Sequence, residues 1–65
     1  MKKLLKQIDS LYEMIESGLL TKSEAMRQLR ELRLSIADKY NEGSDNFMIL
    51  IYSLIDVNNL IEDLY

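Results

Sequence analysis

The positions of two glycines, in a chain without proline, most constrain how this sequence can fold. Gly18 and Gly43 divide the 65 residues into three segments of similar length. Glycine just past a helix end is the commonest C-terminal stop, because it adopts a left-handed conformation without a Cβ clash. The sequence therefore predicts three helices between these points, over about residues 2–17, 22–41 and 45–64.

Apolar residues recur at the helical period in each segment. The stripe of the first segment is Leu4, Ile8, Leu11 and Ile15, that of the second is Ala25, Leu29, Leu32, Ile36 and Tyr40, and that of the third is Phe47, Leu50, Leu54, Val57, Ile61 and Leu64. Spacings of three and four residues place each stripe on one face of a helix. We therefore expect an all-α fold, a small up-down-up three-helix bundle that forms one helical domain over residues 1–65.

Capping signals mark where the second and third helices begin. Thr21-Lys22-Ser23-Glu24 is a capping box. In this motif the Thr21 hydroxyl accepts from the Glu24 N–H, and the Glu24 carboxylate reaches back to the Thr21 backbone N–H. Either Ser44 or Asp45 caps the third helix. These local signals agree with the helix starts that the apolar stripes predict.

The size of the chain limits what can stabilise it. A domain of this length buries only about 60% of its unfolded surface, and small domains often add disulfides, metals or oligomerisation. The sequence contains neither cysteine nor histidine, so disulfides are impossible and the usual zinc, iron–sulfur and haem ligand sets are absent. Without those side chains the usual nucleophile and general base are missing too, and we predict no enzymatic activity, no catalytic residue, no metal site and no cofactor.

Charge and hydropathy restrict the class of partner and the location. The net charge of −3 argues against sequence-independent binding to nucleic-acid phosphates and is compatible with a basic protein surface. Met1–Leu5 is similar to the start of a signal peptide, but Lys6, Gln7 and Asp9 interrupt any apolar region after it. The apolar run over 47–55 is far shorter than the ~20 residues needed to span a bilayer. We expect a cytoplasmic protein that does not enter the membrane.

The third segment carries more apolar residues than one helix face can bury. At 100° per residue, a second stripe lies beside the first and consists of Met48, Ile51, Tyr52 and Ile55. Ile49 and Leu60 lie on the far side, and Leu34 of the second helix also points away from its stripe. Contiguous exposed apolar residues tend to mark interfaces, so we expect a homodimer through the third helix, or a protein partner, at these residues. Asn58 lies near the second stripe, where a buried amide would fix the register of a dimer. The alternative is that a very small protein exposes a few apolar residues, which is normal.

Arg27, Arg30 and Arg33 recur every three residues on the second helix. Guanidinium groups bind oxyanions through two hydrogen bonds, so this edge fits an acidic partner protein or a small anionic ligand such as a nucleotide. The alternative is a solvated helix face, on which Glu24 and Glu31 pair with the arginines at helical spacing.

Two short stretches are similar to known helical families. Ser17–Glu24 resembles the first hairpin of small bacteriocin-immunity proteins and a hairpin of short bacterial oligomerisation modules. Ser44-Asp45-Asn46, then Tyr52-Ser53 and Asp56, is similar to a stretch in the Hha family of nucleoid-protein modulators, although that family's histidine after the aspartate is missing here. Some of the residues in both stretches are ones that helix capping favours at those positions. The first resemblance implies an inhibitor of another protein or an oligomerisation module, and the second implies a modulator of nucleoid proteins.

The apolar surplus, together with the absent catalytic groups, predicts a small acidic interaction module. We expect an inhibitor, antitoxin or immunity-type protein, in the style of phage or mobile-element proteins, that occludes a surface of a partner protein. One alternative is an oligomeric regulatory module that sequesters a small anionic ligand at an arginine-lined interface. The other is a nucleoid-protein or DNA-binding modulator.

Overall fold

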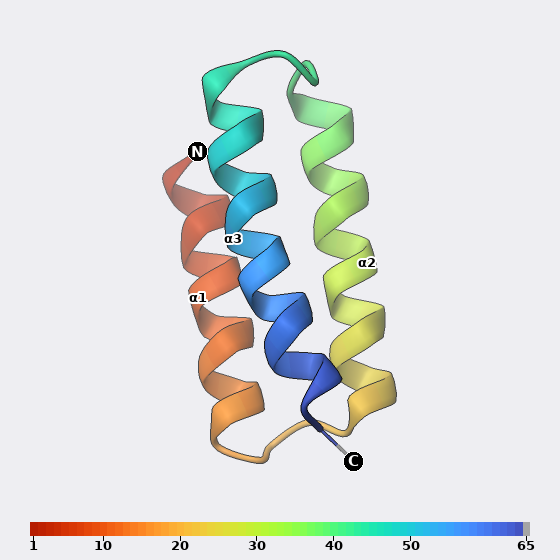
Figure 1. The fold of residues 1–65 in the computed structure, drawn as a ribbon. Coiled ribbons are helices and arrows are strands. Elements are labelled where there is room, and N and C mark those ends of the chain that lie inside the picture. Colours follow the sequence, from red (N-terminus) through yellow and green to blue (C-terminus); the bar gives the residue numbers. More distant parts are fainter. Residues whose placement is uncertain (65) are drawn as a thin grey trace.

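The computed structural model describes residues 1–64 and consists of three α-helices joined by short connections (Figure 1). The helices are α1 over Lys2–Glu16, α2 over Lys22–Lys39 and α3 over Asp45–Glu62. α1 and α3 run in the same direction, and α2 runs against both (Figure 1). The predicted up-down-up three-helix bundle is therefore confirmed, with each helix ending one or two residues earlier than expected.

A Schellman motif ends α1. The Gly18 N–H donates to the Ile15 carbonyl at 3.1 Å, and the Leu19 N–H donates to the Met14 carbonyl at 3.0 Å. Gly18 has a φ of +75°, the left-handed conformation that this motif requires and that glycine adopts without steric cost. The predicted role of Gly18 as a helix stop is confirmed.

The end of α2 differs from the prediction, which extended the helix to Asn41 and used Gly43 as its stop. Tyr40 leaves the helical conformation with φ −130° and ψ 147°, so the helix ends at Lys39. Within residues 1–64 only Gly18 has a positive φ, and Gly43 is therefore part of the connection rather than a left-handed cap. Tyr40 is partly buried against the core. Tyr40 thus leaves the helix where it packs against the core, and a local capping rule does not detect such a contact.

Side-chain caps begin α2 and α3. The capping box between Thr21 and Glu24 is present with both of its reciprocal hydrogen bonds, as predicted. At α3 the cap is Ser44, whose Oγ accepts from the Phe47 N–H at 3.1 Å, and Asp45 is the first helical residue. The Ser44 hydroxyl also donates to the Asn41 carbonyl at 2.9 Å, which fixes the connection to the start of α3.

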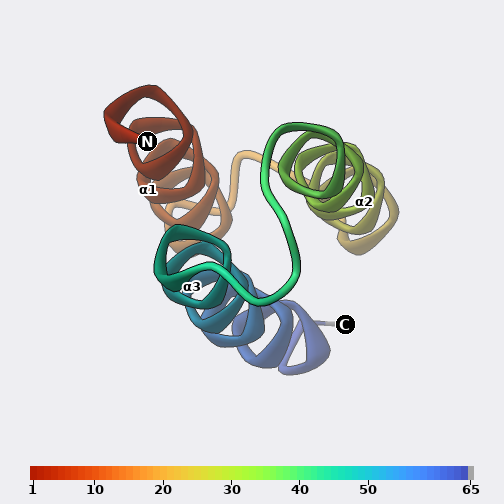
Figure 2. The same ribbon diagram turned by 90° about the horizontal axis from the view of Figure 1, so that it is seen from above.

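Apolar side chains from all three helices form one core. Its fully buried members are Leu4, Ile8, Leu11, Ile15, Ala25, Leu29, Ile36, Leu50, Leu54, Val57 and Ile61. All of them belong to the predicted stripes, and the remaining stripe residues are partly buried at the margin. α3 packs against both other helices, whereas α1 and α2 contact each other least (Figure 2). The core is therefore closed on the side of α3 and least covered between α1 and α2.

Candidate interaction surfaces

Charged residues are distributed unevenly over the three grooves between the helices. Within residues 1–64, the α1/α2 groove is lined by three cations and one carboxylate, and the α1/α3 groove by three carboxylates and no cation. The α2/α3 groove has two arginines and one glutamate among apolar side chains. The whole chain has a net charge of −3, so the α1/α2 groove carries the opposite sign to the chain.

The α2/α3 groove is mainly apolar. It contains two adjoining hollows of about 390 and 260 Å³, which share Arg33 and Ile51. The other residues that line it are Leu29, Arg30, Leu34, Ala37, Glu42, Phe47, Leu54, Ile55 and Asn58. Two arginines thus border a strip of apolar side chains.

Most of the predicted surplus apolar residues are exposed. Among them, Leu34 is 66% exposed, Tyr52 60%, Ile55 47%, Ile49 46% and Met48 39%. Met48, Tyr52 and Ile55 share one side of α3, because they are spaced by four and three residues. We name the surface of Met48, Tyr52 and Ile55 the α3 face; Leu34 lies at its α2 edge and Ile49 at its α1 edge. Within residues 1–64, no helix has the length and apolar content needed to cross a membrane.

Two residues of the predicted surplus belong to the bundle instead. Ile51 and Leu60 are partly buried and pack against the core. Leu60 lies in the α1/α3 groove beside Ile8 and Tyr12. The prediction that Leu60 lies beyond the reach of a three-helix monomer is therefore wrong. A helical wheel gives the direction of a side chain. It does not show whether a neighbouring helix covers that side chain.

The α1/α3 groove is acidic. It encloses about 510 Å³, and its charged residues are Asp9, Asp56 and Asp63. Tyr12 and Ser53 line it too. The Ser53 hydroxyl donates to the Ile49 carbonyl at 3.0 Å. Ile49 lies on the same side of α3 as Ser53, because the two are four residues apart on the helix. The α3 face is thus bordered by an acidic groove on one side and by arginines on the other.

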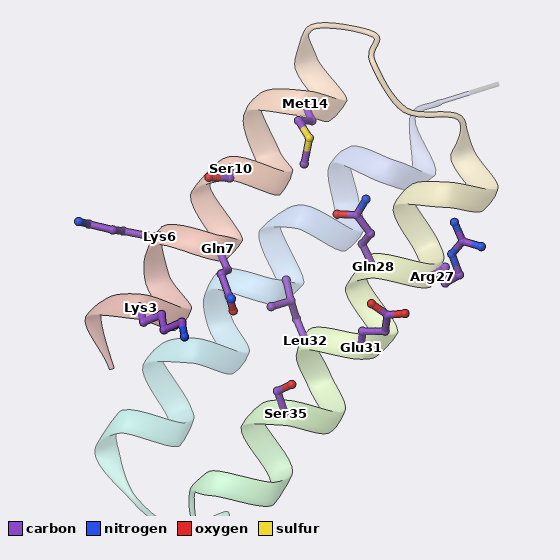
Figure 3. Close-up of a pocket in the computed structure, with 10 residues that line it drawn as sticks. All are labelled: Lys3, Lys6, Gln7, Ser10, Met14, Arg27, Gln28, Glu31, Leu32 and Ser35. Carbon is purple, nitrogen blue, oxygen red and sulfur yellow. The ribbon is translucent and has the colours of Figure 1, made fainter.

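The α1/α2 groove is the largest of these hollows, at about 800 Å³, and eight of its ten lining residues are polar or charged (Figure 3). The residues that line it are Lys3, Lys6, Gln7, Ser10 and Met14 of α1 and Arg27, Gln28, Glu31, Leu32 and Ser35 of α2. In Figure 3, Gln7, Gln28 and Leu32 extend toward the space between the helices, whereas Lys6 and Arg27 extend outward on opposite sides. The groove therefore has a mixed polar and apolar floor, a positively charged rim on α1, and a rim on α2 where Arg27 and Glu31 offset each other.

Sequence reasoning did not identify the α1/α2 groove, although a signal was present. Lys3, Gln7, Ser10 and Met14 follow one another at spacings of four, three and four beside the apolar stripe of α1. Polar residues at helical spacing are typical of a solvated face. The pattern on one helix does not show that a similar face of another helix lies opposite.

The predicted arginine row is divided between two grooves. Arg27 lines the α1/α2 groove, whereas Arg30 and Arg33 line the α2/α3 groove. Residues three apart on a helix differ in direction by about 60°, so Arg27 and Arg33 differ by about 120°. The three guanidinium groups therefore do not converge on one site in the monomer.

The Asn58 side chain has a partner within its own helix. Its amide nitrogen donates to Glu62 Oε1 at 3.3 Å, and Asn58 is partly buried at the α2/α3 groove. The hydrogen bond satisfies one amide donor in the monomer. A role for Asn58 in dimer register stays a prediction.

Within residues 1–64, no three histidine, cysteine, aspartate or glutamate side chains gather closely enough to hold a metal ion. The chain matches no model of a known protein family, no curated protein and no solved structure. Function is therefore inferred from the fold, the α3 face and the three grooves.

Proposed function

We propose that this chain is a protein–protein interaction module that forms a homodimer through the α3 face and acts by covering a surface of a partner protein. The observation that carries the proposal is the row of exposed Met48, Tyr52 and Ile55 along one side of α3, which Leu34 extends onto α2. Contiguous apolar surface of this kind marks interfaces in small proteins.

The accessible surface is large enough to supply such an interface. The chain exposes 4785 Å², whereas the mass scaling for folded monomers gives about 4300 Å² for 7.6 kDa. The elongated bundle, 34 × 18 × 15 Å in its Cα extents, accounts for part of this excess. A standard interface covers about 800 Å² per partner. One long side of the bundle is sufficient to provide that area.

Opposite charges along the two edges of the α3 face support a parallel dimer. Arg30 and Arg33 lie on the α2 side, and Asp9 and Asp56 line the groove on the α1 side. A two-fold axis parallel to α3 brings the α2 edge of each copy against the α1 edge of the other, so arginines meet aspartates twice. An axis across α3 makes the helices antiparallel and brings arginines against arginines. Charge complementarity therefore favours the parallel arrangement.

Measurement of the molar mass in solution tests the dimer. We expect twice the 7.6 kDa of one chain in sedimentation equilibrium, and a shift to the monomer in Ile55→Glu, because a carboxylate at the α3 face has to be desolvated on association. Leu19→Glu is the matched control, since Leu19 is more exposed and lies in the α1–α2 connection. A wild-type chain that is monomeric at millimolar concentration would contradict the proposal.

Cross-linking tests the direction of the two helices. The natural chain has no cysteine, so Met48→Cys and Asn59→Cys each introduce a single thiol, toward opposite ends of α3. In the parallel dimer each variant forms a disulfide with its own kind. In the antiparallel dimer the mixed disulfide between the two variants dominates when they are combined. Non-reducing electrophoresis and mass spectrometry distinguish these products.

A further inference from the structure

We propose that the α1/α2 groove binds an acidic amphipathic helix of a partner protein. The inference rests on the proposed function in one respect, namely that the chain is an interaction module. It does not require the dimer, because the groove is lined by α1 and α2 alone, and the outward side of α3 faces away from that helix pair (Figure 2). Dimerisation and groove binding therefore use separate surfaces.

The dimensions of the groove fit a short helix. Its lining runs along α1 from Lys3 to Met14, which corresponds to about 16 Å at the rise of an α-helix, or about three turns. α1 and α2 contact each other least of the three helix pairs. A helix laid between them adds a fourth element to the bundle and covers the least protected margin of the core.

The floor of the groove selects an amphipathic segment. Met14 and Leu32 are partly buried, and they offer apolar surface to a narrow stripe on the incoming helix. Gln7 and Gln28 extend into the same space and can each donate and accept hydrogen bonds (Figure 3). A helix that enters a groove by its apolar side is a common mode of recognition.

The rims of the groove select negative charge. Lys3 and Lys6 on α1 and Arg27 on α2 are balanced by Glu31 alone, although the chain as a whole is acidic. The two lysines on α1 match a ligand with carboxylates on the flank of its apolar stripe that faces α1, and Arg27 is one further cation on α2. A compact anion needs cations that converge on one point, whereas Lys6 and Arg27 extend away from each other (Figure 3). The distribution of charge therefore favours an acidic helix over a small anionic ligand.

A designed peptide pair tests the proposal by NMR. The probe is a synthetic helical peptide with a leucine stripe flanked by glutamates, and its matched control has lysine at each glutamate. Gln7 and Gln28 are the only glutamines of the sequence and both line the groove, so their side-chain amide signals report on it directly. We expect the glutamate peptide to shift both signals, less so at higher salt, and the lysine peptide to leave them unchanged. The asparagine side-chain amides serve as internal controls.

Charge reversal tests whether the rims carry the affinity. Lys6→Glu/Arg27→Glu is expected to weaken binding of the glutamate peptide about tenfold, because two attractions become repulsions at partly screened distances. Lys22→Glu/Lys39→Glu makes the same change in net charge outside the groove and is expected to change the affinity little. Circular dichroism of both variants verifies that the helices persist.

Three outcomes would overturn the inference. The first is that the glutamine signals do not respond to the peptide, and the second is that both double variants lose affinity equally. The third is that inorganic tripolyphosphate shifts the glutamine signals as strongly as the peptide does. The last outcome identifies a site for a compact anion instead. If the monomeric Ile55→Glu variant binds the peptide, the result supports binding in the α1/α2 groove whether or not the wild type forms a dimer. The two proposals therefore succeed or fail separately.

Discussion

Thr21 and Glu24 satisfy one another's hydrogen bonds at the start of α2. The Glu24 N–H donates to Thr21 Oγ1 at 3.2 Å, while Glu24 Oε1 accepts from the Thr21 N–H at 3.2 Å and from the Thr21 hydroxyl at 2.9 Å. This pair fixes where the chain re-enters a helix after Gly18, and it thereby sets which α2 residues lie opposite α1.

Loss of the Thr21 hydroxyl is expected to destabilise the fold. Thr21→Ala removes the acceptor for the Glu24 N–H, and substitutions of this kind at an N-cap cost about 1 kcal/mol. Urea unfolding followed by circular dichroism measures the difference. Ser23→Ala is the control, because it removes a hydroxyl two residues later that the capping box does not use. Equal losses in the two variants would contradict the assigned role of Thr21.

The same pair predicts a pH-dependent contribution to stability. Hydrogen bonds from the Thr21 backbone N–H, then from its side chain, lower the pKa of Glu24 below its ordinary value of 4.5. A carboxyl group whose pKa is lower in the folded state stabilises the fold above the unfolded pKa, and this contribution is lost as the pH falls through the folded pKa. We expect the stability difference between wild type and Glu24→Gln to shrink as the pH is lowered below 4.5. A difference that stays constant over that range would show that ionisation of Glu24 is not involved.

The two glycines are expected to respond differently to alanine. Gly18→Ala places a Cβ on a residue with φ +75°, which costs about 1–2 kcal/mol even though no atom lies within 4 Å of that Cβ. Gly43→Ala also meets no atom within 4 Å and has no positive φ, so it is expected to be neutral or to stabilise by about 0.5 kcal/mol through the unfolded state. Thermal unfolding of both variants gives the comparison, and a larger loss at Gly43 would refute it.

A dimer through the α3 face makes the stability depend on concentration. If association accompanies folding, the Tm of the wild type rises with protein concentration by mass action, whereas the Tm of Ile55→Glu is independent of it. Calorimetry over a hundredfold range of about micromolar to sub-millimolar concentration measures this dependence. Leu19→Glu is expected to behave like the wild type. A wild-type Tm that does not change with concentration would speak against a dimer coupled to folding.

Local features of the sequence predicted the helices and the core. The residues that begin or end a helix act on the backbone within a few residues of themselves, as Gly18, Thr21 and Ser44 do. Their effect on the helix ends can therefore be predicted without knowledge of the fold. Apolar spacing likewise places Leu50 and Leu54 on one face, and both are buried. The end of α2 was missed because Tyr40 leaves the helix where it packs against the core, a contact that neighbouring residues do not specify.

Which residues share a surface depends on how the helices pack together. The sequence by itself determined that α3 carries surplus apolar residues and that Arg27, Arg30 and Arg33 wind around α2, because both follow from the pitch of a helix. Only the tertiary structure decided that Leu60 is covered by α1, that Arg27 faces a different groove from Arg33, and that Gln7 lies across a groove from Gln28 (Figure 3). The reason is geometric: the chemistry of a groove is the combination of two faces, and the pairing of faces is set by packing of the core rather than by the sequence of either helix.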